Sequence, residues 1–509
     1  MVRERNGREQ PTPEVVRHTQ RPLRPADRLD EGTRTVDVHN RITRSPVLPD
    51  LDFQSIRDEL EIPDEFPAAA LDAAAEAARS PRLPELDATH LEMVTIDPPG
   101  AKDLDQAMAI EARSRGGWRV HYAIADVAAF VTAGDPVDVE TRRRTQTFYS
   151  PDQSNPLHPA AIGADAASLL PDGERPSVLW TIDVNDDGTM GDIDVRRAMV
   201  RSRAQLTYQE VHDAMAAGRA PASVAELASI GPALQADASR RGAIELGLPE
   251  QEVVPHAGGG WTLALRANLP VEEWNAQISL LTGRAAAVLM LDGGHGILRT
   301  VPAADPARFP RLRNSASSLG IEWRRSEGPG EVLARLDMAN PRHAAFADLA
   351  AELLRGSGYT PINGEPLDDP GHAGVGAPYS HVTAPLRRLV DRFGSEVCIA
   401  LSASKAVPGW AEEAIAELPE LMREGDGLSR ELERTAVDAT EAFVLHQRVG
   451  EVFPAAVMET GRENGTIVID DPAVKARCKG DDLPLGAEIH ARCTEADVAR
   501  RTVAFERVS

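Results

Sequence analysis

Hydrophobic and polar residues alternate with strand-like spacing in the first half of the chain. Residues 93–96 and 118–124 are short runs of this kind, and residues 178–184 form a third run that leads into a turn sequence at 185–188. Strand patterns continue to about residue 205. This part of the chain therefore predicts a β-sheet.

Helical spacing dominates after these strands. The longest helical pattern covers residues 271–291, and the Asp-Gly-Gly sequence at 292–294 is a typical helix stop. Residues 68–78 are rich in alanine and predict an earlier helix. Further helices are predicted at 344–354, 385–401, 411–418 and 428–447.

Alternation returns after Gly450, in short strand patterns at 455–458, 465–469, 488–493 and 502–505. Short strands with turn signals over roughly 60 residues suit a small barrel such as an OB-fold. We see no internal repeat. The whole pattern predicts the α+β class: a mostly antiparallel sheet flanked by helices, plus a small C-terminal OB-like β-barrel.

The start of the chain differs from the rest. Residues up to about 44 are polar, include several prolines and lack a periodic apolar pattern, which predicts a flexible arm. We divide the chain into a flexible arm at 1–45, a helical lead-in at 46–90, a large α+β domain at 91–448 and the small barrel domain at 449–509.

The composition excludes several classes of protein. With 509 residues, 42% of them hydrophobic, the chain is long enough for one large domain and small ones. No stretch approaches the ~18 apolar residues of a membrane span, and the polar, arginine-rich N-terminus does not resemble a secretory signal. Cys398, Cys478 and Cys493 are odd in number and lack CxxC spacing, which argues against a disulfide framework and a zinc site. We expect a cytoplasmic protein without membrane contact.

The formal net charge is −24. Taken alone, this charge argues against a nucleic-acid partner, because phosphate binding depends on lysine and arginine. An acidic protein can nevertheless carry a basic groove. Nearly all basic residues are arginines, a bias that a genome rich in G and C explains. The charge therefore leaves the partner open.

Three aspartates cluster after the first strand pattern. Asp97 follows that strand, a Pro-Pro-Gly turn comes next, and Asp103 and Asp105 come after two further residues. Carboxylates crowded in this way repel one another, and a hard divalent cation relieves the repulsion. Ligands that are all oxygen favour Mg²⁺ or Mn²⁺ over Zn²⁺. From this segment alone, a solvated acidic loop and the DxD of a sugar-nucleotide transferase remain alternatives.

A second segment, residues 377–391, combines a cap signal with two arginines. Thr383 can cap a helix whose first turn holds Pro385. Arg387 and Arg388 then lie near the N-terminal turns, where the helix dipole also favours anions. The alternative is a capped surface helix with two exposed arginines.

Together, the two segments resemble motifs of the ribonuclease II family, the RNB-type 3′-to-5′ exoribonucleases. Residues 120–127 are similar to the family's His-Ile-Ala-Asp-Val strand, and residues 372–376 resemble the segment before its arginine motif. The similarity covers about 90–445, with no motif out of order. It identifies 91–448 as an RNB-type catalytic domain and 449–509 as an OB-like RNA-binding domain. Further matching segments are 148–151, 156–159, 168–171, 175–176 and 271–274.

The resemblance implies a hydrolytic enzyme that degrades single-stranded RNA to nucleoside 5′-monophosphates. In the family, two Mg²⁺ ions hold the scissile phosphate, activate a water and stabilise the leaving oxygen. The RNA strand enters a narrow channel with its 3′ end first. We therefore expect Mg²⁺ as cofactor, with Mn²⁺ as the alternative, and single-stranded RNA as partner. We do not expect DNA as the main substrate, and we expect a monomer.

The resemblance also assigns the catalytic residues. By position, Asp97, Asp103 and Asp105 match metal-binding carboxylates, and Asp105 matches the most essential of them. Arg387 matches the residue that clamps the scissile phosphate, and Arg388 lies beside it as an RNA contact.

Two further residues are expected to contact RNA. Tyr149 matches an aromatic residue that stacks on the terminal base. Glu272 matches a residue near the terminal ribose, where contacts to the 2′-hydroxyl select RNA over DNA. Without the resemblance, Tyr149 could also be a core aromatic residue, and Glu272 an ordinary acid at a helix N-terminus.

The chain departs from the family in three places. Gln106 stands where the family usually has a fourth aspartate; its amide oxygen can ligate a cation but brings no charge, so one metal should bind less tightly. Ser279 stands where asparagine is common. About 90 residues precede the catalytic domain, and they lack the strands of the two OB domains of typical bacterial members. A catalytically weakened RNA-binding protein with the RNB fold is therefore the alternative. An unrelated DxD metal enzyme would leave the arginine motif unexplained.

Overall fold

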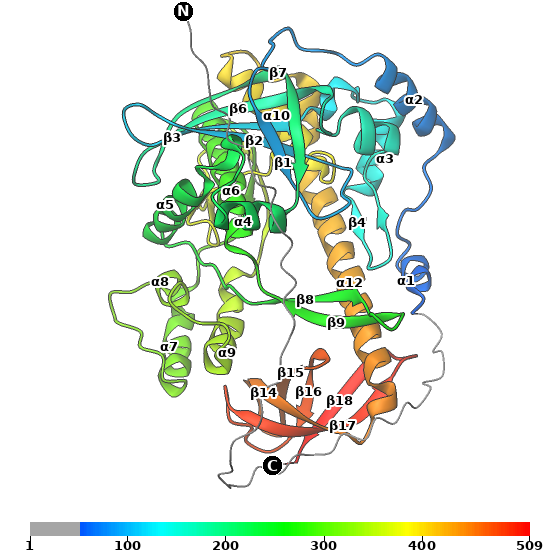
Figure 1. The fold of residues 1–509 in the computed structure, drawn as a ribbon, viewed down its shortest axis with the longest axis vertical. Helices are drawn as coiled ribbons and strands as arrows, with labels where there is room; N and C mark the ends of the chain where they lie inside the picture. The colour runs from blue at the N-terminus through cyan, green and yellow to red at the C-terminus, as the bar shows by residue number, and fades with distance from the viewer. Residues whose placement is uncertain (1–50, 509) are drawn as a thin grey trace, which may run out of the picture. The chain divides into compact units, whose positions relative to one another are not determined.

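A closed barrel of five strands forms the first half of the fold (Figure 1). The structure is a computed structural model that describes residues 51–508. Neighbouring strands are antiparallel, except β1 and β7, which close the barrel in parallel. The mostly antiparallel sheet expected from the sequence is confirmed. The strands follow one another as β1 (Met93–Ile96), β2 (Gln106–Ala112), β3 (Trp118–Ala125), β6 (Glu174–Val184) and β7 (Met190–Leu206).

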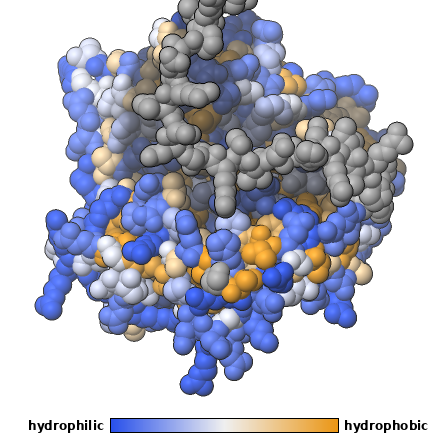
Figure 2. All heavy atoms as spheres, turned by 60° about the horizontal axis from the view of Figure 1, so that its bottom comes forward, coloured by the Kyte–Doolittle hydropathy of each residue, from blue (hydrophilic) through white to orange (hydrophobic). Residues whose placement is uncertain are grey.

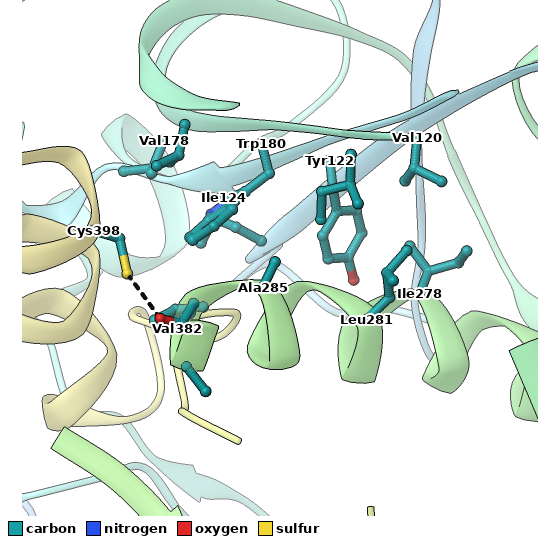
Figure 3. Close-up of a cluster of buried hydrophobic side chains, with 14 of the residues drawn as sticks. Val120, Tyr122, Ile124, Val178, Trp180, Ile278, Leu281, Ala285, Val382 and Cys398 are labelled. Carbon is teal, nitrogen blue, oxygen red and sulfur yellow. Dashed lines mark hydrogen bonds between the residues drawn. The ribbon is translucent and has the colours of Figure 1, made fainter. Parts of the chain in front are cut away.

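One face of this barrel packs on helix α6 (Pro270–Gly293), as Figure 3 shows. Tyr122 of β3 pairs with Trp180 of β6, and both are fully buried. Ile278 and Leu281 of α6 belong to the same hydrophobic cluster. Every second residue of a strand points to the same face, so the alternation in the sequence supplies the apolar surface that covers α6.

Helix α6 confirms the helix expected at 271–291. Pro270 occupies its first turn, and Gly294 ends it in the left-handed conformation, with φ 69°. Gly283 lies against the ring of Tyr379, because a Cβ at this position would stand 2.1 Å from Tyr379 Cε2. This glycine lets the segment that carries the arginine motif lie directly on α6.

The helix expected at 385–401 begins later than the sequence indicated. Helix α10 spans Leu389–Ser402, and the residues before it form a turn. Thr383 does not cap this helix, because its hydroxyl lies 3.0 Å from the Ser279 hydroxyl. The Ala384 N–H donates to Asp391 Oδ1 at 2.7 Å instead. Tertiary hydrogen bonds therefore override the local cap signal.

The other helices of the second half are confirmed with shifted bounds. Helix α9 (Pro341–Ala350) continues as a 3₁₀ turn, Ala351–Leu354. Helix α11 spans Gly409–Ile415, and α12 spans Leu418–Leu445, so α12 begins earlier than expected. Helix α12 contacts β4 as well as strands β17 and β18 of the C-terminal barrel.

The C-terminal barrel is confirmed as a closed five-strand barrel in the order β14-β15-β16-β18-β17. The sequence patterns missed one strand, β16, although its residues alternate between buried and exposed after Val474. The five strands are β14 (Val452–Thr460), β15 (Asn464–Asp470), β16 (Ala473–Lys479), β17 (Glu488–Asp497) and β18 (Thr502–Arg507).

Two short helices precede the first barrel, and α2 confirms the helix expected at 68–78. The flexible arm expected at 1–45 lies outside the described residues, and the domain limits remain predictions. All three cysteines are buried and free. The remaining elements are α1 (Phe53–Glu59), α2 (Ala68–Arg79), α3 (Pro136–Arg144), β4 (Phe148–Tyr149), β5 (Ser154–Asn155), α4 (Tyr208–Ala216), α5 (Leu227–Arg240), β8 (Glu250–Pro255), β9 (Trp261–Arg266), β10 (His295–Thr300), α7 (Phe309–Ser318), α8 (Pro329–Leu333), β11 (Gly358–Asn363), β12 (Gly371–His372) and β13 (Ala377–Pro378).

The surface turned forward in Figure 2 is mainly hydrophilic, with hydrophobic residues gathered in a band across it. On and beside the C-terminal barrel, the exposed large apolar side chains include Val449, Val452 and Val498. Single exposed apolar residues of this kind are common on folded proteins. Among the described residues, no helix has the length and apolar character that crossing a membrane requires.

Glu441 lies where α12 meets the C-terminal barrel, and it should make the stability of the fold depend on pH. Its carboxylate accepts hydrogen bonds from Gln251 Nε2 at 2.7 Å and from the Lys475 N–H at 3.0 Å. Burial raises the pKa of this carboxyl group from 4.5 to about 7. The folded protein therefore holds this proton more tightly than the unfolded chain, and stability falls as the pH rises from about 4.5 to about 7.

We expect Glu441→Gln, which resembles the protonated form, to unfold at a higher temperature than the wild type at pH 8. The gain in unfolding free energy should be on the order of 3 kcal/mol at pH 8 and should vanish near pH 4. Thermal melts across this pH range measure it, with the exposed Glu433→Gln on the same helix as control. A gain of the same size at pH 4 and pH 8 would contradict the prediction.

Candidate active site

A cavity of about 1010 Å³ opens beside the end of β1. Its wall comes mainly from three stretches that are distant in the sequence: the loop from β1 to β2, residues 147–164, and the turn before α10. Glu272 and Arg388 do not line the cavity. The expected site residues that it brings together are Asp97, Asp103, Asp105, Gln106, Tyr149 and Arg387.

Asp97 is fixed by the end of β1. Its backbone N–H donates to the Leu206 carbonyl at 2.9 Å, which continues the pairing of β1 with β7. One carboxylate oxygen, Oδ2, is buried without a hydrogen-bond partner. Burial and, to a smaller extent, the charge of Asp103 raise the pKa of Asp97 to about 6. A bound cation would relieve this unfavourable setting for a negative charge.

Asp105 is the most buried of the three aspartates, with 5% of its surface exposed. Oδ1 accepts a hydrogen bond from the Leu386 N–H at 2.7 Å, and Oδ2 lies 3.4 Å from Arg387 Nε. Burial raises the pKa of Asp105 to about 8, although Arg387 and the Leu386 N–H act in the opposite direction. Asp105 therefore joins the acidic loop to the arginine motif.

The turn before α10 is held at several backbone groups. The Leu386 carbonyl lies 3.1 Å from His158 Nδ1, and the Arg387 carbonyl accepts from the Thr147 N–H at 3.0 Å. Burial lowers the pKa of His158 to about 4, so the neutral ring donates from Nδ1 to this carbonyl. These bonds fix the backbone of Arg387, whereas its side chain keeps 41% of its surface exposed. The guanidinium can therefore receive an anion in the cavity.

Gln106 uses both ends of its amide inside the protein. Its Nε2 donates to the Thr383 carbonyl at 2.7 Å, and its Oε1 accepts a hydrogen bond from the Tyr122 hydroxyl. The side chain thus links β2 and β3 to the arginine segment. The amide oxygen expected as a metal ligand is already engaged here.

We expect Gln106→Asp to lower stability and to strengthen metal binding. The shorter side chain loses the donor to Thr383, which should cost about 1–3 kcal/mol, and it adds a charge beside the three aspartates. Melting temperatures should fall in EDTA, and 1 mM Mn²⁺ should then raise them more than in the wild type. Gln106→Ala loses the donor without adding a charge, so its melting temperature should fall without a larger response to Mn²⁺. If Mn²⁺ raised the melting temperatures of the wild type, Gln106→Asp and Gln106→Ala by the same amount, the prediction would be wrong.

Arg388 and Glu272 have other partners. Arg388 forms a two-pronged pair with Asp391, at 3.0 Å and 2.8 Å, and this pair turns its guanidinium away from the cavity. Glu272 accepts from the Leu269 N–H at 2.6 Å and from Arg266, as an acid at the start of α6 commonly does. Neither residue is brought to the carboxylates by this arrangement.

Tyr149 is 52% exposed and lines the cavity, so it is not a core aromatic residue. The preceding residue, Phe148, is 1% exposed on the opposite side of the short strand β4. Tyr208 and His158 also line the cavity. The sequence analysis did not single out Tyr208, and it included His158 only in the matching segment 156–159, without a role. No local sequence signal marks Tyr208, and His158 acquires its role only through contact with residues far along the chain.

The three aspartates supply the cavity with oxygen ligands. Within residues 51–508, no group of three or more His, Cys, Asp or Glu side chains is spaced to hold a metal ion as it stands. The unpartnered oxygen of Asp97 and the all-oxygen donor set of Asp97, Asp103 and Asp105 nevertheless suit a hard divalent cation. Gln106 contributes neither a charge nor a free amide group.

Comparison with known proteins agrees with this fold. Residues 86–393 match the RNB domain, and residues 451–508 match the RNase II-type exonuclease C-terminal S1 domain. Ribonuclease R of Aquifex aeolicus is 25% identical over 462 residues, which cover 81% of this chain and 63% of the relative. Exoribonuclease 2 of Vibrio vulnificus (strain YJ016) is 34% identical over 137 residues, 27% of this chain and 21% of the relative.

Solved structures show the same fold. Mycoplasma genitalium RNase R in complex with ribose-methylated single-stranded RNA superposes with a TM-score of 0.78 at 18% identity, covering 90% of this chain and 77% of that one. Yeast Ssd1, described as a pseudonuclease, gives 0.63 at 15% identity, covering 86% of this chain and 53% of that one. The chain spans 63% of the Aquifex aeolicus relative and 46% of Vibrio cholerae ribonuclease R. Since the RNB domain matches more than half of its residues, the chain belongs to the RNB family of ribonuclease II-type proteins.

Proposed function

We propose that the protein is a hydrolytic 3′-to-5′ exoribonuclease that degrades single-stranded RNA to nucleoside 5′-monophosphates with the help of Mg²⁺ or Mn²⁺. One observation carries this proposal: buried Asp105 and half-exposed Arg387 meet at the wall of one cavity with Asp97 and Asp103. Negative ligands for a cation and a positive fork for a phosphate thus stand side by side.

The residues of the chain divide the work in this proposal. Asp97, Asp103 and Asp105 would hold the cation. When bound, the cation would supply Lewis-acid chemistry at the phosphate and lower the pKa of a water molecule. Arg387 is placed to bind the phosphate oxygens and to stabilise the charge that grows on them during cleavage. Its backbone is fixed in advance, so little reorganisation is needed when the RNA binds.

RNA binding in this proposal involves Tyr149. Its exposed ring offers a flat surface for a terminal base of any identity, which suits an enzyme that removes one nucleotide after another. Glu272 and Arg388 would contact RNA only after they release their present partners, which are Arg266 and the Leu269 N–H for Glu272 and Asp391 for Arg388. A cytoplasmic location and a monomeric state also belong to this proposal.

The test uses purified full chain and a 5′-labelled single-stranded RNA, with Mg²⁺, Mn²⁺ or EDTA. We expect a ladder that shortens with time to a small core in either metal, and no shortening in EDTA. The same RNA labelled uniformly should release nucleoside 5′-monophosphates, which thin-layer chromatography identifies. RNA binding without shortening in both metals would reject the exoribonuclease.

A catalytically weakened RNA-binding protein is the second candidate, because Gln106 replaces a carboxylate and is bonded internally. The fold alone does not distinguish an active nuclease from an inactive one, since a protein described as a pseudonuclease shares it. The same assay separates the two candidates: slow or absent shortening together with tight, EDTA-insensitive RNA binding would favour the second.

A further inference from the structure

Residues 51–66 precede the part of the chain that matches the RNB domain, and they pack against the hairpin of β4 and β5. This hairpin carries Tyr149, which faces the cavity. Three sets of contacts join the two segments: an ion pair, an apolar cluster and a group of hydrogen bonds to backbone carbonyls.

The ion pair joins α1 to the tip of the hairpin. Arg57 donates to both carboxylate oxygens of Asp152, at 2.6 Å and 3.0 Å. The Arg57 side chain is 3% exposed and that of Asp152 34%. A two-pronged pair with one partner buried fixes the direction of both side chains, unlike a mobile surface pair. It spans 95 positions of sequence, so it couples two segments that are distant in the chain.

The apolar cluster holds the base of the same hairpin. Phe148 belongs to one hydrophobic cluster with Phe53 and Ile56 of α1 and Leu432 of α12, and all four are buried. Successive residues of a strand point to opposite faces, so a seated Phe148 turns Tyr149 toward the cavity. Loss of the α1 side of this cluster would free the strand to rotate.

The hydrogen bonds close the far side of the hairpin. Arg144, 1% exposed, donates to the carbonyls of Pro63, Asp64 and Glu65 and also to that of Pro156, just beyond β5. Asn155 of β5 donates to Asp64 Oδ1 at 3.0 Å. The buried guanidinium thus connects the lead-in segment to the end of the hairpin.

We propose that residues 51–66 are a positioning element for Tyr149: helix α1 orders the β4–β5 hairpin and thereby sets the site that takes the 3′-terminal base. The part that concerns RNA rests on the proposed function. A helix of seven residues has little stability of its own, so its order and that of the hairpin depend on each other. In this proposal Arg57 acts through Asp152, because Arg57 itself does not line the cavity.

The first experiment follows amide hydrogen exchange without RNA. Arg57→Met should speed exchange of residues 148–155 by about 10-fold and leave β3 and β6 unchanged. Asp152→Asn breaks the same pair from its exposed side and should act likewise if Arg57→Met folds poorly. Arg501→Met removes the other ion pair of α1, with Glu59 at 2.6 Å on the surface, and serves as the matched control. Unchanged exchange in both Arg57→Met and Asp152→Asn overturns the proposal.

The second experiment measures binding in EDTA of a single-stranded RNA with 2-aminopurine as its 3′-terminal base. Tyr149→Ala should weaken binding and base quenching by about 10-fold, and Arg57→Met by about 3- to 10-fold. The double variant should bind no worse than Tyr149→Ala, because Arg57 acts through Tyr149. Arg57→Lys should restore part of the loss.

The outcomes separate the two proposals. Two results would overturn the role of α1 in base placement. The first is a double variant whose loss of RNA affinity equals the product of the two single losses. The second is Arg57→Met with faster amide exchange in the hairpin but normal quenching of the 3′-terminal base. If the wild type binds no RNA but Arg57→Met still speeds hairpin exchange, the positioning role stands and the proposed function fails.

Discussion

Replacing Asp105 by asparagine is expected to abolish RNA shortening, with a rate loss on the order of 1,000-fold or more. Asparagine has the same shape and can still accept the Leu386 N–H, so the turn that carries Arg387 should keep its place. What disappears is the negative charge at the most buried carboxylate of the cavity. The variant therefore isolates charge from structure.

Single-turnover decay of a 5′-labelled RNA in Mg²⁺ measures this loss. The matched control is Asp213→Asn, an exposed aspartate on α4, which should behave as the wild type. RNA binding by Asp105→Asn should stay within about threefold, since Asp105 itself repels phosphate. Shortening at a tenth of the wild-type rate or faster would show that Asp105 is not essential.

The second large effect is expected for Arg387→Lys, about 100-fold in kcat. Lysine keeps the charge but cannot form the planar fork that binds two phosphate oxygens. Lysine has no Nε, so the variant also loses the contact between Arg387 Nε and Asp105 Oδ2. The positive charge that remains should keep the affinity for the RNA substrate, so KM should change by less than about fivefold.

Steady-state kinetics on a short single-stranded RNA separate kcat from KM. Arg423→Lys changes an arginine that pairs with Glu420 on the surface of α12 and should leave both constants unchanged. A rise in KM with an unaltered kcat would assign Arg387 to general RNA binding rather than to the cleavage step.

Local patterns were enough to predict the elements that depend on their own residues. Helix α6 has a proline at its start and a glycine at its end, and β3 begins with alternating apolar and polar residues, so both were predicted nearly to their limits. Closure of the first barrel was not predictable, because β1 meets β7 in parallel across more than 100 residues of intervening chain. Tertiary contacts of this kind leave no periodic trace.

The site shows the same division. The aspartates and Arg387 could be proposed from motifs, since each motif is a short stretch of sequence. Arg387 and Arg388 looked alike, yet one faces the cavity and the other pairs with Asp391, because only the folded turn decides which way each side chain points. Arg57 gave no signal at all, since its partner lies 95 positions away.

The bond between Asp105 and the Leu386 N–H has a consequence for how the protein is made. Its two ends lie 281 positions apart, so a growing chain carries all three aspartates long before the arginine turn leaves the ribosome. At roughly 5–20 residues per second, this interval lasts about 15–60 s. Under the proposed function, the nascent polypeptide would therefore carry its proposed cation ligands before its proposed phosphate clamp, and it would be unable to cleave the message from which it is read.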